Sequence, residues 1–82
     1  MDDKLKEKCA VFGVYGDNLD VSRLTFYGLF ALQHRGQEAS GIATSNGETI
    51  HYHKDIGLVT HVYSEDDIKK LKGHIAIGHN LY

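Results

Sequence analysis

The residue best suited to covalent chemistry in this 82-residue sequence is its single cysteine, Cys9, which follows the charged leader Met1–Lys8. If the leader were removed, Cys9 would combine a thiol with a pKa of about 8.5 and a free α-amine with a pKa of about 7.7–8.0 in one residue. That amine could accept the thiol proton directly or through a water molecule. The pattern therefore predicts a latent nucleophile, and the alternative interpretation of Cys9 is a small buried hydrophobic residue.

Histidines form a second set of candidate residues. His51 and His53 alternate along one predicted strand, where they could meet His34 or His61 as zinc ligands. No HExxH motif or cysteine-containing ligand set accompanies them, and a zinc site needs further convergent ligands. We therefore predict no metal site and interpret His51 and His53 as half-exposed strand residues, with His34 and His79 packed in the core.

The first elements that must position Cys9 are a strand and a helix. The apolar run Cys9–Tyr15 predicts a buried strand. Asp20 is a suitable N-cap for a helix that continues through Gln33 to Arg35, where Gly36 would end it. Apolar residues occupy most of the circumference of this helix, so it needs cover on two sides.

The remaining sequence predicts a hairpin, two further strands and a short helix. Ala39–Ser45 would pair with Glu48–Lys54 across Asn46-Gly47, a dipeptide typical of type I′ turns. Leu58–Tyr63 is expected to be a strand, and His74–His79 is expected to be the last strand, with its two isoleucines on one face.

Ser64 is expected to begin the short helix, with Asp67 as its capping-box partner. Three acidic residues, Glu65 to Asp67, fall in the first turn, where they complement the helix dipole. We prefer this interpretation to an acidic cation site.

Length, charge and composition exclude several classes of function. A chain of 82 residues forms at most one domain. A net charge of −2 gives no basic surface for nucleic acid or for an anionic membrane. No run approaches the roughly 18 apolar residues that span a bilayer, and a lone cysteine cannot form an intrachain disulfide. We therefore expect a cytoplasmic chain that binds neither nucleic acid nor membrane.

Three segments carry a resemblance to a known family: CAVFGV (Cys9–Val14), YGLFALQHRGQE (Tyr27–Glu38) and SGIA (Ser40–Ala43). The similarity continues through Gly57–Val59 and Ile77–His79. Together these segments resemble the amidophosphoribosyltransferases, which are also called glutamine phosphoribosylpyrophosphate amidotransferases.

The resemblance implies an α+β fold, namely part of the αββα sandwich of N-terminal nucleophile hydrolases, with antiparallel strands and a long buried helix, truncated at Tyr82. Residues 1–8 would be a propeptide-like leader, and residues 9–82 the N-terminal part of a class II glutamine amidotransferase domain. The phosphoribosyltransferase domain would be absent.

The resemblance also implies a reaction. Cys9 would attack the carboxamide of glutamine and release ammonia, which converts phosphoribosyl pyrophosphate to 5-phosphoribosylamine in de novo purine synthesis. The complete enzyme would bind glutamine and phosphoribosyl pyrophosphate, form a homo-oligomer, and use Mg²⁺ and, in members that carry a propeptide, a [4Fe–4S] cluster. No cofactor is expected in residues 1–82.

Two residues depart from the family pattern. After Ile77-Gly78-His79 the family continues Val-Arg, and its arginine binds glutamine, but Asn80 and Leu81 stand here. Leu81 cannot form a charge-assisted pair with the α-carboxylate of the substrate.

Two further features of the family concern the site: Arg35, as a candidate near-site residue, and an oxyanion-hole Asn-Gly pair. Arg35 belongs to the family motif and is expected near the nucleophile; alternatively it is a cation at a helix C-terminus. The Asn-Gly pair would lie beyond Tyr82, and Asn46-Gly47 is not its equivalent. We therefore expect the chain alone to be inactive. The alternative is a non-catalytic remnant or partner-binding module of the same fold.

Overall fold

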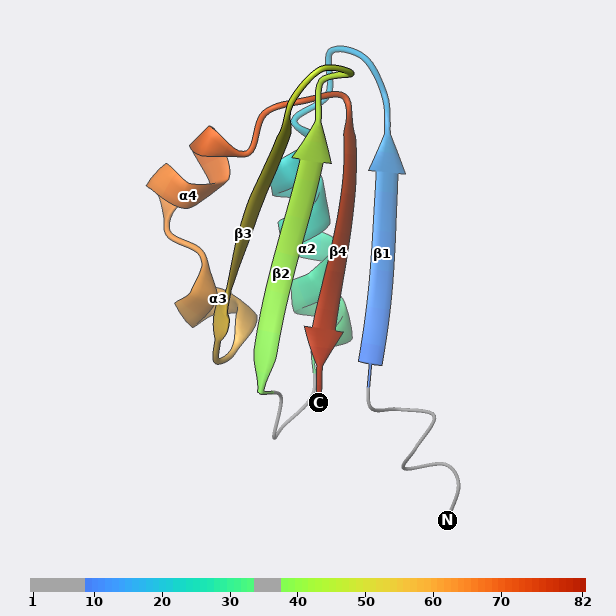
Figure 1. Ribbon diagram of the computed structural model, residues 1–82. Helices are drawn as coiled ribbons and strands as arrows, with labels where there is room; N and C mark the ends of the chain where they lie inside the picture. The colour runs from blue at the N-terminus through green and yellow to red at the C-terminus, as the bar shows by residue number, and fades with distance from the viewer. Residues whose placement is uncertain (1–8, 34–37) are drawn as a thin grey trace.

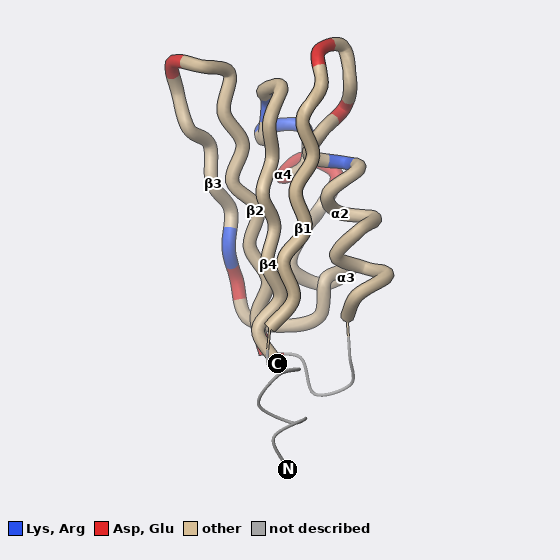
Figure 2. The backbone as a smooth tube through the Cα atoms, turned by 90° about the vertical axis from the view of Figure 1, so that its right-hand side faces the viewer, with Lys and Arg blue, Asp and Glu red and all other residues tan. Residues whose placement is uncertain are grey.

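The computed structural model describes residues 9–33 and 38–82, which form a four-stranded sheet and three helices (Figure 1). The elements are β1 (Cys9–Tyr15), α2 (Val21–Leu32), β2 (Ala39–Ser45), β3 (Ile50–Ile56), α3 (Val59–Val62), α4 (Glu65–Lys70) and β4 (Ile75–Leu81). The helices lie on one side of the sheet, as the side-on view in Figure 2 shows. None of the described helices is long and apolar enough to cross a membrane.

The strand order is β1-β4-β2-β3, and every neighbouring pair is antiparallel. The last strand, β4, therefore lies between β1 and β2. Leu81, near its end, is the register partner of both Cys9 in β1 and Ala39 in β2. Ala39 in turn pairs with Ile56 in β3.

The two faces of the sheet differ because side chains alternate along each strand. One face packs on the helices and includes the buried residues Ile42, Ala76 and Asn80. We call the other the open face, because it carries no helix of the described chain. Its side chains form four rows across the sheet: Cys9, Leu81, Ala39, Ile56; then Val11, His79, Gly41, Lys54; then Gly13, Ile77, Ala43, Tyr52; then Tyr15, Ile75, Ser45, Ile50.

The core lies between the helix-facing side of the sheet and the helices. It consists of Leu29, Ile42, Val59, Val62, Tyr63, Ile68 and Leu71, with Phe12 and Phe26 packed against them. Gly78 in β4 has no side chain, and this lets α2 approach the strand closely. A Cβ built at Gly78 would lie 2.6 Å from Thr25 Cγ2 and 2.7 Å from Leu29 Cδ1.

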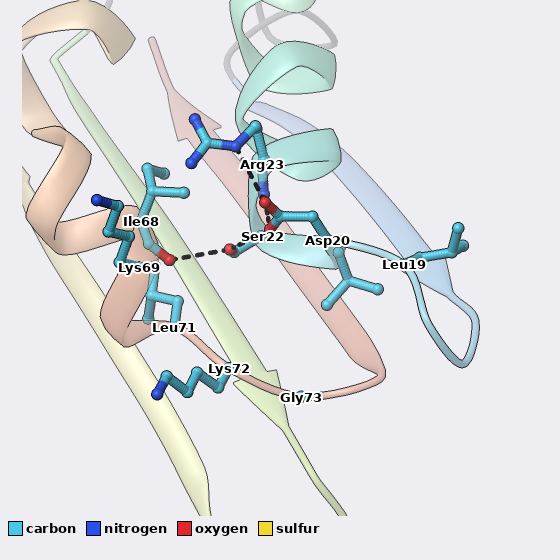
Figure 3. A pocket seen from close by; sticks show the side chains of 10 residues that line it. Leu19, Asp20, Ser22, Arg23, Ile68, Lys69, Leu71, Lys72 and Gly73 are labelled. Carbon is cyan, nitrogen blue, oxygen red and sulfur yellow. Dashed lines mark hydrogen bonds and ion pairs between the residues drawn. The ribbon is translucent and has the colours of Figure 1, made fainter.

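Helix α2 begins as predicted. The Asp20 carboxylate accepts a hydrogen bond from the backbone N–H of Arg23 at 3.3 Å. At the same end, Ser22 Oγ donates to the carbonyl of Ile68 at 3.0 Å, and Arg23 forms ion pairs with Asp20 and with Glu65. These contacts join the start of α2 to α4 around a small pocket (Figure 3).

The C-terminal end of α2 differs from the prediction, because the helix ends at Leu32, with Gln33 as its C-cap. Its terminal carbonyls find partners on β4 and just beyond it: Asn80 Nδ2 donates to Leu29 O at 2.9 Å, and Tyr82 Oη donates to Leu32 O. Residues 34–36, where the prediction placed the end of this helix, lie outside the described residues.

The sequence predicts cover on two sides of α2, but the described residues cover it on one side only. Its inner residues Val21, Thr25 and Leu29 are buried, whereas Tyr27 and Phe30 on its outer side are about half exposed, at 57% and 49%. The described chain therefore leaves an apolar side of this helix exposed.

Two local predictions are wrong. Leu58–Tyr63 is not a strand, since Val59–Val62 forms one helical turn, α3. Gly57, with a positive φ of 128°, turns the chain out of β3. The N–H of Val59 then donates to Gln33 Oε1 at 3.0 Å, so a partner distant in sequence holds the helical turn.

The second wrong prediction is the type I′ turn. Four residues, 46–49, connect β2 to β3, and of the central dipeptide only Gly47 has a positive φ. Asn46 instead uses its side-chain oxygen to accept hydrogen bonds from the N–H groups of Glu48 and Thr49. The two strands pair as a hairpin, as predicted, but the second strand is Ile50–Ile56 and not Glu48–Lys54, so Ser45 lies opposite Ile50.

Candidate active site

Cys9 lies at the first position of β1, and its side chain is exposed on the open face. The alternative interpretation of a buried hydrophobic cysteine does not hold in this structure. A thiol in this position can meet a ligand that lies on the open face, because no helix of the described chain covers it.

A groove of about 620 Å³ runs across the open face from Cys9 to β3. This volume lies within the usual range for small-ligand sites. Its lining residues come from all four strands: Cys9, Val11, Ala39, Lys54, Asp55, Ile56, His79, Asn80 and Leu81. The groove is therefore large enough for an amino acid and has the thiol at one end.

Leu81 lies directly beside Cys9, because the two are register partners on the same face. Its side chain is 42% exposed. The position at which the family resemblance implies a glutamine-binding arginine is thus adjacent to the thiol, and an apolar side chain occupies it here.

His79 lies on the open face and not in the core, so that prediction is wrong. Its ring covers Gly41: a Cβ built at Gly41 would lie 2.5 Å from His79 Nε2. Nε2 also lies 3.5 Å from the hydroxyl of Tyr52. The absence of a side chain at position 41 therefore lets the imidazole span β2 and form one wall of the groove.

Asn80 carries a structural role that the sequence did not reveal. Its side chain is fully buried; Oδ1 accepts from Ser40 Oγ at 2.9 Å, while Nδ2 donates to Leu29 O. Ser40 Oγ also lies 2.8 Å from the hydroxyl of Tyr63. Burial raises the pKa of Tyr63 well above its usual value, so this hydroxyl stays protonated. The network fixes β4, and with it the end of the groove, to α2.

The histidines of β3 are half-buried on its helix-facing side, which confirms the prediction for His51 and His53. His53 Nε2 lies 2.8 Å from the carbonyl oxygen of Val62 and 3.6 Å from Asp67 Oδ2. No group of three or more histidine, cysteine or acidic side chains suited to a metal ion occurs among residues 9–33 and 38–82.

The acidic residues at the start of α4 act as the sequence indicates. Ser64 and Asp67 form the predicted capping box, with bonds of 3.0 and 3.1 Å. Glu65 pairs with Arg23, and the hydrogen bond from that guanidinium lowers the pKa of the Glu65 carboxyl.

Of the other predicted site residues, the structure describes only Asn46-Gly47. Arg35 and His34 lie outside the described residues, as does the leader Met1–Lys8. Asn46-Gly47 lies at the end of the sheet opposite Cys9, beyond the row of Tyr15 and Ile75. Its placement in a hairpin turn agrees with the prediction.

Comparison with solved structures defines the class of fold. The described chain superposes with a TM-score of 0.81 on a structure of the allosteric regulatory enzyme of purine biosynthesis, at 46% identity, covering 88% of this chain and 15% of that one. The sheet and helices therefore form part of the glutaminase domain of an N-terminal nucleophile hydrolase fold. The expected α+β class is confirmed.

A second solved structure that is similar to this chain carries the name of the family expected from the sequence. It is glutamine phosphoribosylpyrophosphate amidotransferase from B. subtilis, complexed with ADP and GMP, with a TM-score of 0.74 and 46% identity over 83% of this chain and 15% of that one.

Curated sequences agree. The chain is 51% identical over 80 residues to the amidophosphoribosyltransferase of Synechocystis sp. and 55% identical over 75 residues to that of Methanocaldococcus jannaschii. These matches cover 98% and 90% of this chain but only 16% of each relative. No family model matches. The resemblance to amidophosphoribosyltransferases is confirmed, and the chain spans about a sixth of their length.

Proposed function

We propose that this chain supplies the cysteine nucleophile of a glutamine-hydrolysing amidophosphoribosyltransferase. The observation that carries the proposal is the position of Cys9: it is the first residue of β1, it is exposed, and it lines a groove of about 620 Å³. Residues 1–8 act as a removable leader in this proposal, and residues 9–82 as the N-terminal part of the glutaminase domain.

The chemistry follows from removal of the leader. The new α-amine of Cys9 accepts the thiol proton, and the sulfur attacks the carboxamide carbon of glutamine. The proton passes from the amine to the departing nitrogen, so that ammonia leaves and a γ-glutamyl thioester remains. Water then hydrolyses the thioester to glutamate and restores the thiol. An amide nitrogen lacks this basicity, so the uncleaved chain is inert.

The remaining functions belong to other parts of the complete protein. There, ammonia displaces pyrophosphate from phosphoribosyl pyrophosphate to give 5-phosphoribosylamine. A [4Fe–4S] cluster needs four thiolates, and this chain has one cysteine, so its residues do not fit that group. No described cluster of acidic side chains fits Mg²⁺ either. We also propose a homo-oligomeric complete enzyme in the cytoplasm, where reducing conditions preserve a free thiol.

A second candidate function is a non-catalytic, partner-binding module of the same fold. The observation that favours it is Leu81, which places an apolar side chain beside the thiol. In this reading the groove and the exposed side of α2 are protein-binding surfaces.

Thiol reactivity separates the two candidates. We compare a chain that begins at Cys9 with the chain 1–82, using a diazoketone analogue of glutamine and, as a control for simple accessibility, iodoacetamide. The proposal predicts labelling of the shorter chain by the diazoketone about 100-fold faster than of the longer one, the order of rate expected from a positioned base. The Cys9→Ser variant reports any labelling at other sites. Equal rates for both chains would favour the non-catalytic module.

A further inference from the structure

We propose that Gln33 is a positioning residue for the reaction at Cys9. Its side-chain carboxamide begins a series of hydrogen bonds that passes through the turn after β3 and reaches the residue paired with the nucleophile. This inference rests on the proposed function, and it adds a residue that acts only through its neighbours. Figure 1 shows the parts involved, namely α3, the C-terminus of the chain and the start of β1, at the same end of the sheet.

The first link is a helix cap supplied from far away in the sequence. Val59 begins α3 and is fully buried, so its N–H needs a partner inside the protein. Leu58, the N-cap residue, forms no side-chain hydrogen bond. Gln33 Oε1 accepts a hydrogen bond from this N–H at 3.0 Å instead. The carboxamide of Gln33 therefore fixes the turn relative to the end of α2.

The second link joins the same turn to the start of β2. The N–H of Gly57 donates to the carbonyl of Glu38 at 2.7 Å, and Glu38 directly precedes β2. Gly57 has a φ of 128°, a conformation that favours glycine, and it directs the chain from β3 into α3. The turn thus binds Gln33 through one N–H and Glu38 through another, two residues apart.

The third link leads to the nucleophile. The N–H of Glu38 donates to the carbonyl of Leu81 at 2.7 Å, and Leu81 is the register partner of Cys9. Three hydrogen bonds and one strand pairing therefore connect Gln33 with Cys9. If the first bond is lost, a buried N–H is left without its acceptor, and the turn that holds Glu38 loses its attachment to α2.

Gln33 acts from a rigid base. Its own N–H donates to the carbonyl of Phe30 at 3.4 Å, which closes the last turn of α2. The same end of the helix is held to β4, where Asn80 Nδ2 donates to the carbonyl of Leu29. A misplacement of about 1 Å at a reacting group costs a rate factor of about 100, so the precision of these supports matters for catalysis.

The first test follows the Cys9 end of the sheet by amide hydrogen exchange in the chain 1–82. Gln33→Leu removes the acceptor at similar size, whereas Gln33→Glu keeps an oxygen there. We expect Gln33→Leu to speed exchange at the N–H groups of Gly57 and Glu38 at least about tenfold, and Gln33→Glu to leave it near the parent rate. At the opposite end of the sheet, exchange at the N–H groups of Gly16 and His74 should not change.

The matched control is Asn46→Leu. Asn46 also uses its side-chain oxygen to accept hydrogen bonds from backbone N–H groups, those of Glu48 and Thr49, but at the end of the sheet opposite Cys9. The control variant should speed exchange at these two groups. It should leave exchange at Gly57 and Glu38 unchanged.

The second test connects the contacts with the reaction. In the chain that begins at Cys9, we measure the labelling rate with the diazoketone analogue of glutamine and divide it by the rate with iodoacetamide. We expect Gln33→Leu to lower this ratio at least about tenfold. Gln33→Glu should restore the ratio, and Asn46→Leu should not change it. A residue that only stabilises the fold would leave the ratio as it is.

Three outcomes would overturn the inference. They are exchange that rises at Val59 alone, exchange that rises equally at both ends of the sheet, and a labelling ratio that Gln33→Leu leaves unchanged or Gln33→Glu fails to restore. Failure of the proposed function would appear separately, in the unsubstituted chain, as diazoketone labelling that does not depend on removal of the leader.

Discussion

Replacing the buried amide Asn80 by the isosteric acid in Asn80→Asp tests whether β4 is fixed to α2 through its side chain. The variant keeps the oxygen that accepts from Ser40 but loses the group that donates to Leu29 O. A carboxylate there would face a carbonyl oxygen at a fully buried position. A protonated acid could instead donate its hydroxyl hydrogen and restore the bond.

The size of the effect follows from burial. Full burial raises the pKa of a carboxyl by roughly 3 units. At about 1.4 kcal/mol per unit, the variant loses about 4 kcal/mol when it ionises. A chain of 82 residues has a total free energy of unfolding of about 4–12 kcal/mol. Asn80→Asp should therefore be near its folding threshold at high pH.

The direction of the pH dependence of this variant's stability follows from the linkage between protonation and folding. The folded-state pKa lies above the unfolded value of about 3.9, so the stability that the protonated acid contributes is fully present below pH 3.9 and is lost as pH rises through the folded pKa. Urea unfolding of the variant and of the parent chain, from pH 4 to pH 8, gives the difference at each pH. We expect that difference to grow with a slope approaching 1.4 kcal/mol per pH unit.

The matched control is Asn46→Asp. Asn46 is exposed, and its side-chain oxygen only accepts hydrogen bonds, from Glu48 and Thr49. A carboxylate can take over that role, so no growing loss is expected as the pH rises. The same pH dependence in both variants, or a flat difference for Asn80→Asp, would refute the assigned network.

Two further predictions concern the packing of α2. Gly78→Ala would place a Cβ 2.6–2.7 Å from side-chain carbons of Thr25 and Leu29, so we expect it to lower the free energy of unfolding, measured by thermal denaturation, by about 1–3 kcal/mol. Gly13→Ala is the control and should not lower it, because the nearest atom to its Cβ would be Ala76 O at 3.8 Å. Equal losses in the two variants would contradict the close approach of α2 to β4. Arg23→Met should lower the melting temperature at pH 7, and the difference should shrink as the pH falls. The hydrogen bonds from Arg23 lower the pKa of Glu65 and of Asp20, and the stability linked to each carboxylate is lost as the pH falls through its lowered pKa. A melting-temperature difference that stays constant as the pH falls would point to lost packing instead.

Local signals in the sequence were sufficient wherever an element is stabilised by its own neighbours. Asp20 caps α2, and Ser64 with Asp67 caps α4, because capping involves residues only two or three positions apart. The strand Cys9–Tyr15 was also predicted at its observed bounds, but the prediction that it is buried is wrong, because none of its residues is buried and Val11 and Tyr15 are exposed.

Sequence reasoning failed where distant residues decide the conformation. Val59–Val62 contains two valines and a threonine, which favour strands, yet burial of both valines and the Gln33 side chain hold it as a helical turn. Asn80 gave no local signal, since its partners lie 40 and 51 positions away.

The candidate site divides in the same way. Cys9 was singled out by its residue type and by the leader that precedes it. Its proximity to Leu81 depends on the strand order β1-β4-β2-β3, which strand patterns do not specify. Arg35 lies outside the described residues, so its role stays a prediction.

The central position of β4 has a consequence for synthesis on the ribosome. While the chain emerges, β2 and β3 can pair at once, but β1, made first, has no strand to pair with until residues 75–81 leave the exit tunnel. Such delayed, long-range closure slows the completion of a fold. The strand that begins with Cys9 is thus the first to be translated, yet it gains its place in the sheet only when the last strand has been made.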